Sequence, residues 1–97
     1  MKAYELLVLL NPTLDDETRT AALDKIQEVI TADGGVVDGV DSWGKRKLAY
    51  EIAKLTEGDY ILIDFHTAPS AIAELDRVLH IADAVVRYMI VQREDRD

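Results

Sequence analysis

The spacing of apolar residues changes along the chain and predicts six elements of secondary structure. Continuous or alternating apolar runs, which are typical of strands, occupy residues 4–10, 36–52, 60–67 and 85–93. Helical spacing of apolar residues covers residues 15–33 and then residues 69 to about 80. The pattern also predicts a bulge at Gly44 and a turn at residues 56–59, between the second and third strands.

The order of these elements is β-α-β-β-α-β, which predicts an α+β domain with the ferredoxin-like architecture. In this architecture a four-stranded antiparallel sheet carries both helices on one face. The first and third strands are the most apolar, so we expect them side by side in the middle of the sheet. The 97 residues are the size of a single domain, and we expect residues 93–97 to form a flexible tail.

One face of this sheet is predicted to be open, because both helices cover the other face. Side chains alternate between the two faces of a strand. On this basis we expect nine side chains to face the helices, namely Leu6, Val8, Leu10, Ile61, Ile63, Phe65, Val86, Tyr88 and Ile90. The open side then combines the charged residues Glu5, Asp64, Arg87 and Arg93 with six apolar ones, namely Leu7, Leu9, Tyr60, Leu62, Met89 and Val91. This apolar patch favours a protein partner, and the alternative is that long neighbouring side chains and the terminal tail cover it.

The charge of the chain is unevenly distributed. The formal net charge is −8, which by itself argues against nucleic-acid binding. Residues 15–33 hold six acidic and two basic residues, whereas residues 43–54 hold four basic residues and one acidic residue. A local basic patch can bind phosphate on an acidic protein, because salt screens charges beyond about 8–10 Å. Charge alone nevertheless favours the alternative of a solvated edge strand whose lysines prevent aggregation.

The sequence offers no recognisable catalytic or metal-binding chemistry. It contains no cysteine, which excludes disulfides, thiolate nucleophiles and cysteine-ligated metals. His66 and His80 lack the spacing of metal ligands, and Gly34-Gly35 is not part of a phosphate-binding glycine motif. We therefore expect no enzyme activity, no cofactor, no metal and no small-molecule substrate.

The start of the chain has no signal-peptide layout, and no stretch approaches the roughly 20 apolar residues of a membrane span. We therefore expect a cytoplasmic protein that makes no contact with a membrane.

The segment from Asp41 to Ile52 carries a more specific signal than its charge. It reads Asp-Ser-Trp-Gly-Lys-Arg-Lys-Leu-Ala-Tyr-Glu-Ile. This closely resembles the signature of the bacterial small-subunit ribosomal protein six family, in which Trp or Leu, Gly, a basic pair and Leu-Ala-Tyr-Pro-Ile follow each other. Weaker similarities occur in the same order at Tyr4-Glu5, Asn11-Pro12 and Asp83-Ala84-Val85-Val86-Arg87, so that the resemblance covers residues 2–93. The chain departs from the family in having Glu51 where proline is usual, and in ending at residue 97 without a long tail.

This resemblance implies a structural role in the ribosome. The family binds the central domain of 16S ribosomal RNA during assembly, as a pair with small-subunit ribosomal protein eighteen. For this chain the resemblance implies phosphate contacts from Lys2, Lys45, Arg46, Lys47, Arg87 and Arg93. It also implies that the six apolar residues of the open face contact the partner protein, together with Trp43 and Tyr50. Those two rings are equally candidates for stacking on a base or for simple packing within the hairpin.

Two alternative interpretations belong to other functional classes. The first is a regulatory homodimer of ferredoxin-like fold that binds a small molecule at an interface lined by Gly34-Gly35 or by the loop at Pro12. The second is a small hydrolase in which backbone amides and an arginine hold an anion. Arg19 is the nearest arginine to the expected anion loop, but it lies inside the predicted first helix.

Overall fold

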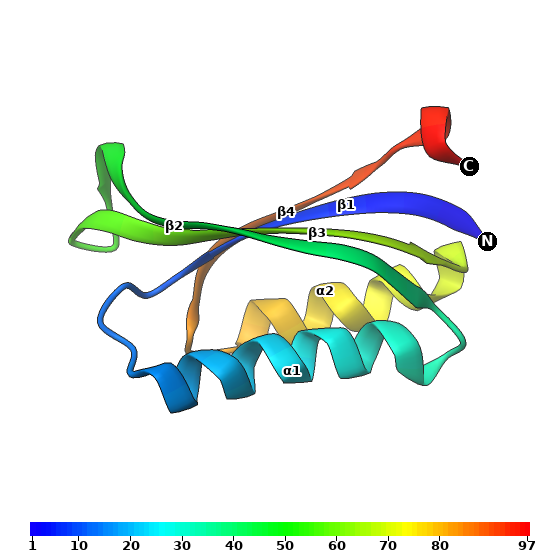
Figure 1. Cartoon of the computed structure of the whole chain (residues 1–97), viewed down its shortest axis with the longest axis horizontal. Coiled ribbons are helices and arrows are strands. Elements are labelled where there is room, and N and C mark those ends of the chain that lie inside the picture. The colour runs from blue at the N-terminus through cyan, green and yellow to red at the C-terminus, as the bar shows by residue number, and fades with distance from the viewer.

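The computed structural model describes residues 1–97 and confirms the predicted order of elements. They are β1 (Lys2–Leu10), α1 (Asp16–Ala32), β2 (Val36–Ile52), β3 (Leu55–Thr67), α2 (Ile72–Ile81) and β4 (Val85–Gln92), with short 3-10 helices η1 (Pro69–Ala71) and η2 (Glu94–Arg96). The strands form one antiparallel sheet in the order β2-β3-β1-β4, so that β1 and β3 lie in the centre as predicted. Both helices pack on one face of this sheet and leave the other face open (Figure 1).

The core lies between the sheet and the two helices. It contains the central-strand residues that were predicted to face the helices, namely Leu6, Val8, Leu10, Ile61, Ile63 and Phe65, all without exposed surface. The helices contribute Ile26, Ile30, Leu75 and Leu79. The prediction for β4 was wrong at one position, because Val85 rather than Val86 packs against this core. A shift in the pairing of β1 with β4 places Val85 opposite Leu10, which the alternation of side chains did not anticipate.

The ends of α1 follow from local sequence chemistry. The Asp15 carboxylate accepts a hydrogen bond of 2.7 Å from the backbone N–H of Thr18 and caps the first turn. Hydrogen bonding to Thr18, through its side chain and then its backbone, also lowers the pKa of Asp15. After the helix, Gly34 adopts a φ of 84°, a conformation that glycine adopts without steric cost.

The hairpin of β2 and β3 is longer than predicted. Its turn lies at Ala53-Lys54, with φ angles of 49° and 66°, and Ile52 pairs with Leu55. The predicted turn at residues 56–59 is therefore wrong, because these residues belong to β3. The predicted bulge is confirmed by a register shift between Ser42 and Gly44. Beyond this bulge the tip of the hairpin turns away from the helices, on the open side of the sheet (Figure 1).

The last five residues lie against the start of β1. The backbone N–H of Arg93 donates to the carbonyl of Ala3 over 2.8 Å, and an Asp97 carboxylate oxygen accepts from the Ala3 N–H. Their mobility in solution stays a prediction. None of the helices combines the length and the apolar character needed to cross a membrane.

Candidate partner and nucleic-acid interface

Strand register brings the predicted apolar residues together on the open face. Leu7 of β1 lies between Leu62 of β3 and Met89 of β4. In the next rows Leu9 lies between Tyr60 and Arg87, and Glu5 lies between Asp64 and Val91. Cross-strand neighbours of this kind share a face. The Leu7 row and the Leu9 row therefore form one largely apolar surface that the helices do not cover.

The six apolar residues differ in how accessible they are. Met89 is 55% exposed, whereas Leu7, Tyr60, Leu62 and Val91 are partly buried. Leu9 is only 4% exposed although it lies on the open face. The hairpin covers it so closely that a Cβ atom at Gly58 would overlap the Leu9 side chain. Leu9 therefore lies beneath the hairpin and is not a free contact surface.

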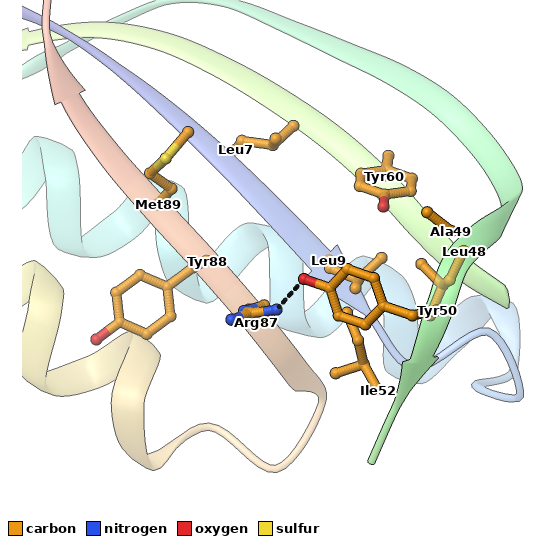
Figure 2. A pocket seen from close by; sticks show the side chains of 10 residues that line it. All are labelled: Leu7, Leu9, Leu48, Ala49, Tyr50, Ile52, Tyr60, Arg87, Tyr88 and Met89. Carbon is orange, nitrogen blue, oxygen red and sulfur yellow. Dashed lines mark hydrogen bonds between the residues drawn. The ribbon is translucent and has the colours of Figure 1, made fainter. Parts of the chain in front are cut away.

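The hairpin and β4 enclose an apolar groove on this face. Its volume is about 500 Å³, and its lining comprises Leu7, Leu9, Leu48, Ala49, Tyr50, Ile52, Tyr60, Arg87, Tyr88 and Met89. Figure 2 shows Tyr50 reaching from the hairpin toward Arg87 of β4. The Arg87 Nη1 donates a hydrogen bond of 3.3 Å to the Tyr50 hydroxyl. The groove thus brings together Arg87, which was predicted to contact RNA, and Tyr50, which was predicted to contact the partner protein.

Three of the groove residues belong to a pattern that was visible in the sequence. Leu48, Tyr50 and Ile52 occupy alternate positions of β2, and all three line the groove. The sequence showed this alternation but not the direction in which the hairpin turns, so Leu48, Ala49 and Ile52 were not predicted as site residues.

The hairpin has a second, basic side. In the strand register, Lys45 of β2 lies opposite Asp59 of β3, and Lys47 lies opposite Glu57. Because these positions alternate with those of Leu48 and Tyr50, their side chains point away from the groove. Both lysines are exposed.

Trp43 and Arg46 are fixed near the bulge. The Trp43 ring lies 6.2 Å from the Tyr60 ring, and its Nε1 donates a hydrogen bond of 3.1 Å to Asp41. The Arg46 Nε donates to the Trp43 carbonyl over 3.1 Å. Trp43 remains 42% exposed, so one part of the ring packs within the hairpin and another part is free for a contact.

An ion pair ties the base of the hairpin to α1. The Arg19 guanidinium contacts both carboxylate oxygens of Asp59, which is only 5% exposed, and donates a hydrogen bond of 2.8 Å to the Ser42 hydroxyl. The hydrogen bond with Asp59 raises the pKa of Arg19. This positioning contact was missed, because nothing in the sequence connects residues 19 and 59. It also occupies the arginine that the hydrolase interpretation would need.

The basic residues predicted to contact RNA fall into two groups. Lys45, Arg46, Lys47 and Arg87 form no ion pair. Lys2 lies 3.6 Å from Asp97, and Arg93 lies 2.9 Å from Glu5 and also pairs with Asp95. The first group is thus open to phosphate, whereas the second would have to exchange carboxylate contacts for phosphate ones.

The tail neutralises the polar end of the open face. The Arg96 guanidinium lies 2.7 Å from Asp64 and 3.4 Å from Glu5. His66 hydrogen-bonds Asp38 and the Arg96 carbonyl, and the carboxylate of Asp38 raises the pKa of His66. The tail therefore covers the charged rows of this face and leaves the apolar rows uncovered.

Comparison with known proteins assigns this arrangement to a family. The sequence model of the family described as ribosomal protein S6 matches residues 3–92. The small ribosomal subunit protein bS6 of Clostridium novyi is 51% identical over 94 residues, which cover 97% of this chain and 99% of the relative. The corresponding protein of Desulfitobacterium hafniense is 46% identical over 95 residues, covering 98% of this chain and 100% of the relative.

The solved structures agree. The crystal structure of 30S ribosomal protein S6 from Thermotoga maritima superimposes with a TM-score of 0.92 at 29% sequence identity, covering 98% of this chain and 90% of that one. The C-terminal domain of the MgtC protein from Mycobacterium tuberculosis has a TM-score of 0.64 at 12% identity, covering 100% of this chain and 93% of that one, and shares the fold alone. The match across almost the whole sequence and the shared sheet and helices confirm the predicted family, and with it a structural, non-enzymatic role: the chain belongs to the ribosomal protein S6 family of the small ribosomal subunit.

Proposed function

We propose that this chain binds the central domain of 16S ribosomal RNA together with small-subunit ribosomal protein eighteen, which docks on the open face of the sheet. The observation that carries this proposal is the division of the β2–β3 hairpin into an apolar side and a basic side. One element can then contact a protein and an RNA at the same time.

The open face supports the protein contact. Leu7, Leu62 and Met89 form a continuous row across three strands, and neither the helices nor the tail cover them. An apolar surface of this kind is costly to leave in water and is typical of an interface. A partner that buries it would also cover the groove beneath the hairpin.

The charge of the chain explains why a partner is needed for RNA binding. A net charge of −8 repels the phosphate backbone, and residues 15–33 alone hold six acidic residues against two basic ones. The basic side of the hairpin supplies only a few cations, among them Lys45 and Lys47. A basic partner bound to the open face adds positive charge next to this patch, so the pair has a higher RNA affinity than the chain alone.

The two contacts are tested separately. Leu62→Asp places a charge in the apolar row and is expected to abolish binding of protein eighteen in calorimetry. Ile81→Asp is the matched control, because Ile81 is 62% exposed at the end of α2, on the helix side of the sheet. If Leu62→Asp binds protein eighteen as tightly as the unmodified chain does, the partner does not dock on this face.

The RNA contact is tested through its salt dependence. The double variant Lys45→Gln/Lys47→Gln is expected to leave partner binding unchanged and to lower the salt slope of RNA binding by about 2, roughly one per lost phosphate contact. Lys25→Gln, at an exposed position of α1, is the control. An unchanged slope for the double variant would exclude this side of the hairpin from the RNA contact.

A further inference from the structure

The groove under the hairpin contains one cation without a carboxylate partner. Of the six arginines, four form ion pairs with carboxylates, namely Arg19, Arg77, Arg93 and Arg96. Arg87 forms none, although the chain contains 19 acidic residues, and its guanidinium donates only to the neutral Tyr50 hydroxyl. Most of its donors are therefore free, at the edge of an otherwise apolar groove.

This combination specifies the chemistry of an occupant. The floor and walls, among them Leu7, Ile52 and Met89, favour a large apolar side chain. The guanidinium of Arg87 favours a carboxylate, which it can bind through two parallel hydrogen bonds. The volume of about 500 Å³ lies within the range of roughly 300–1,000 Å³ that is typical of ligand pockets.

We propose that the groove receives an extended segment of the partner protein in which a large apolar side chain is followed closely by an aspartate or glutamate. The apolar side chain enters between Tyr50 and Met89, and the carboxylate pairs with Arg87 (Figure 2). This inference rests on the proposed function, and it adds the chemistry by which the partner is recognised at this site.

A nucleotide fits the groove less well than this segment does. A phosphate chain is bound by several cations, but Lys45 and Lys47 point to the other side of the hairpin. A base stacks on an aromatic ring, but the Tyr60 ring already packs beside the Trp43 ring, and the exposed Tyr50 ring is tied through its hydroxyl to Arg87. The floor of the groove is aliphatic. RNA is therefore expected on the basic side of the hairpin and protein in the groove.

Tyr50 acts as a positioning residue for this contact. Its hydroxyl accepts the hydrogen bond from Arg87 and holds the guanidinium across the mouth of the groove. Holding the arginine before the partner arrives reduces the entropy that binding would otherwise cost. Tyr50→Phe removes only the hydroxyl, so we expect it to weaken partner binding by about threefold, less than the loss of Arg87 itself.

A charge exchange between the two proteins tests the inference. Arg87→Glu is expected to weaken the binding of protein eighteen by about 30-fold or more, because it places two carboxylates together in an apolar site. In protein eighteen, each aspartate or glutamate next to a large apolar residue is replaced by lysine in turn. One of these variants is expected to restore binding to Arg87→Glu by about tenfold or more. Arg77→Glu, at an exposed position of α2, is the control and is expected to bind as the unmodified chain does.

Each outcome is decisive. If Arg87→Glu binds protein eighteen within about threefold of the unmodified chain, or if no lysine variant of the partner restores the affinity, the inference is wrong and the proposed function stands. If Arg87→Glu instead weakens only the binding of an RNA fragment, Arg87 contacts phosphate and the inference is also wrong. If the unmodified chain does not bind protein eighteen, the proposed function fails and the inference fails with it. Arg87→Gln serves for the same comparison if circular dichroism shows that Arg87→Glu does not fold.

Discussion

Replacing Arg19 by methionine removes the contact that holds the base of the β2–β3 hairpin to α1. The Arg19 side chain is 28% exposed and that of Asp59 is 7% exposed, so the variant leaves a carboxylate almost without water and without its cation. Loss of one partner of a fully buried ion pair costs about 3–5 kcal/mol. Because Arg19 is partly accessible, water can replace some of its contacts, and we expect a cost of about 2–3 kcal/mol.

Urea denaturation and thermal unfolding measure this cost. For a domain of this size each kcal/mol lowers the melting temperature by about 4–8 °C, so Arg19→Met is expected to lower it by about 10–20 °C. Arg77→Met is the matched control, because the Arg77–Glu74 pair has side chains that are 59% and 50% exposed. Exposed pairs of this kind contribute less than about 1 kcal/mol.

A second substitution separates the ion pair from the packing of the arginine. Asp59→Asn in the Arg19→Met background removes the uncompensated charge and is expected to recover part of the lost stability. The reasoning is refuted if Arg19→Met costs less than about 0.5 kcal/mol, or no more than Arg77→Met does. It is also refuted if Asp59→Asn lowers the stability of the Arg19→Met variant further.

Three further predictions concern the turn, the close contact beneath the hairpin and the tail. Lys54→Gly is expected to stabilise the chain by about 1 kcal/mol in urea denaturation, because Lys54 has a φ of 66° that costs a non-glycine residue about 1–2 kcal/mol. Gly58→Ala is expected to destabilise it by about 1–3 kcal/mol, since the new methyl group overlaps a buried leucine of β1, whereas Gly39→Ala meets no atom within 4 Å and serves as the control. Asp38→Asn is expected to lower the pKa of His66 in an NMR titration, because the hydrogen bond with Asp38 is the largest cause that raises it above 6.5. The raised pKa means that protonated His66 stabilises the folded chain below pH 6.5, and that this contribution disappears as the pH rises through the folded-state value.

Each of these predictions has a result that contradicts it. A loss of stability in Lys54→Gly would show that Ala53-Lys54 is not the turn. Equal effects of Gly58→Ala and Gly39→Ala would show that the hairpin does not press on β1. An unchanged His66 pKa in Asp38→Asn would show that the hydrogen bond with Asp38 is not what raises it.

The order of elements and the composition of the core were predictable because their signals are local. Alternation in β1 and β3 assigned Leu6 and Ile63 to the helix side without knowledge of any neighbour. The turn was not predictable in this way. Residues 56–59 have the composition of a turn, but Gly58 is required for the close approach of Leu9, and the turn itself contains no glycine, asparagine or aspartate.

The candidate site was predictable only in part. Its apolar row followed from the same alternation, and the basic hairpin was visible in the distribution of charge. The assignment of that hairpin to RNA followed from the family resemblance. The groove depends on how the hairpin turns over the sheet, which brings Tyr50 to Arg87 across 37 residues of sequence. The ion pair of Arg93 with Glu5 spans 88 residues. Pairs at such separations have no local signature, so the sequence could suggest each residue but not its partner.

The most direct test of the account is a gel-shift titration of a central-domain fragment of 16S ribosomal RNA with this chain, in the presence and absence of protein eighteen and at two salt concentrations. The account predicts a tight complex only when both proteins are present, with an affinity that falls steeply as salt increases. Equally tight binding by the chain alone would contradict the need for a partner. The absence of a complex with both folded proteins would contradict the proposed function itself.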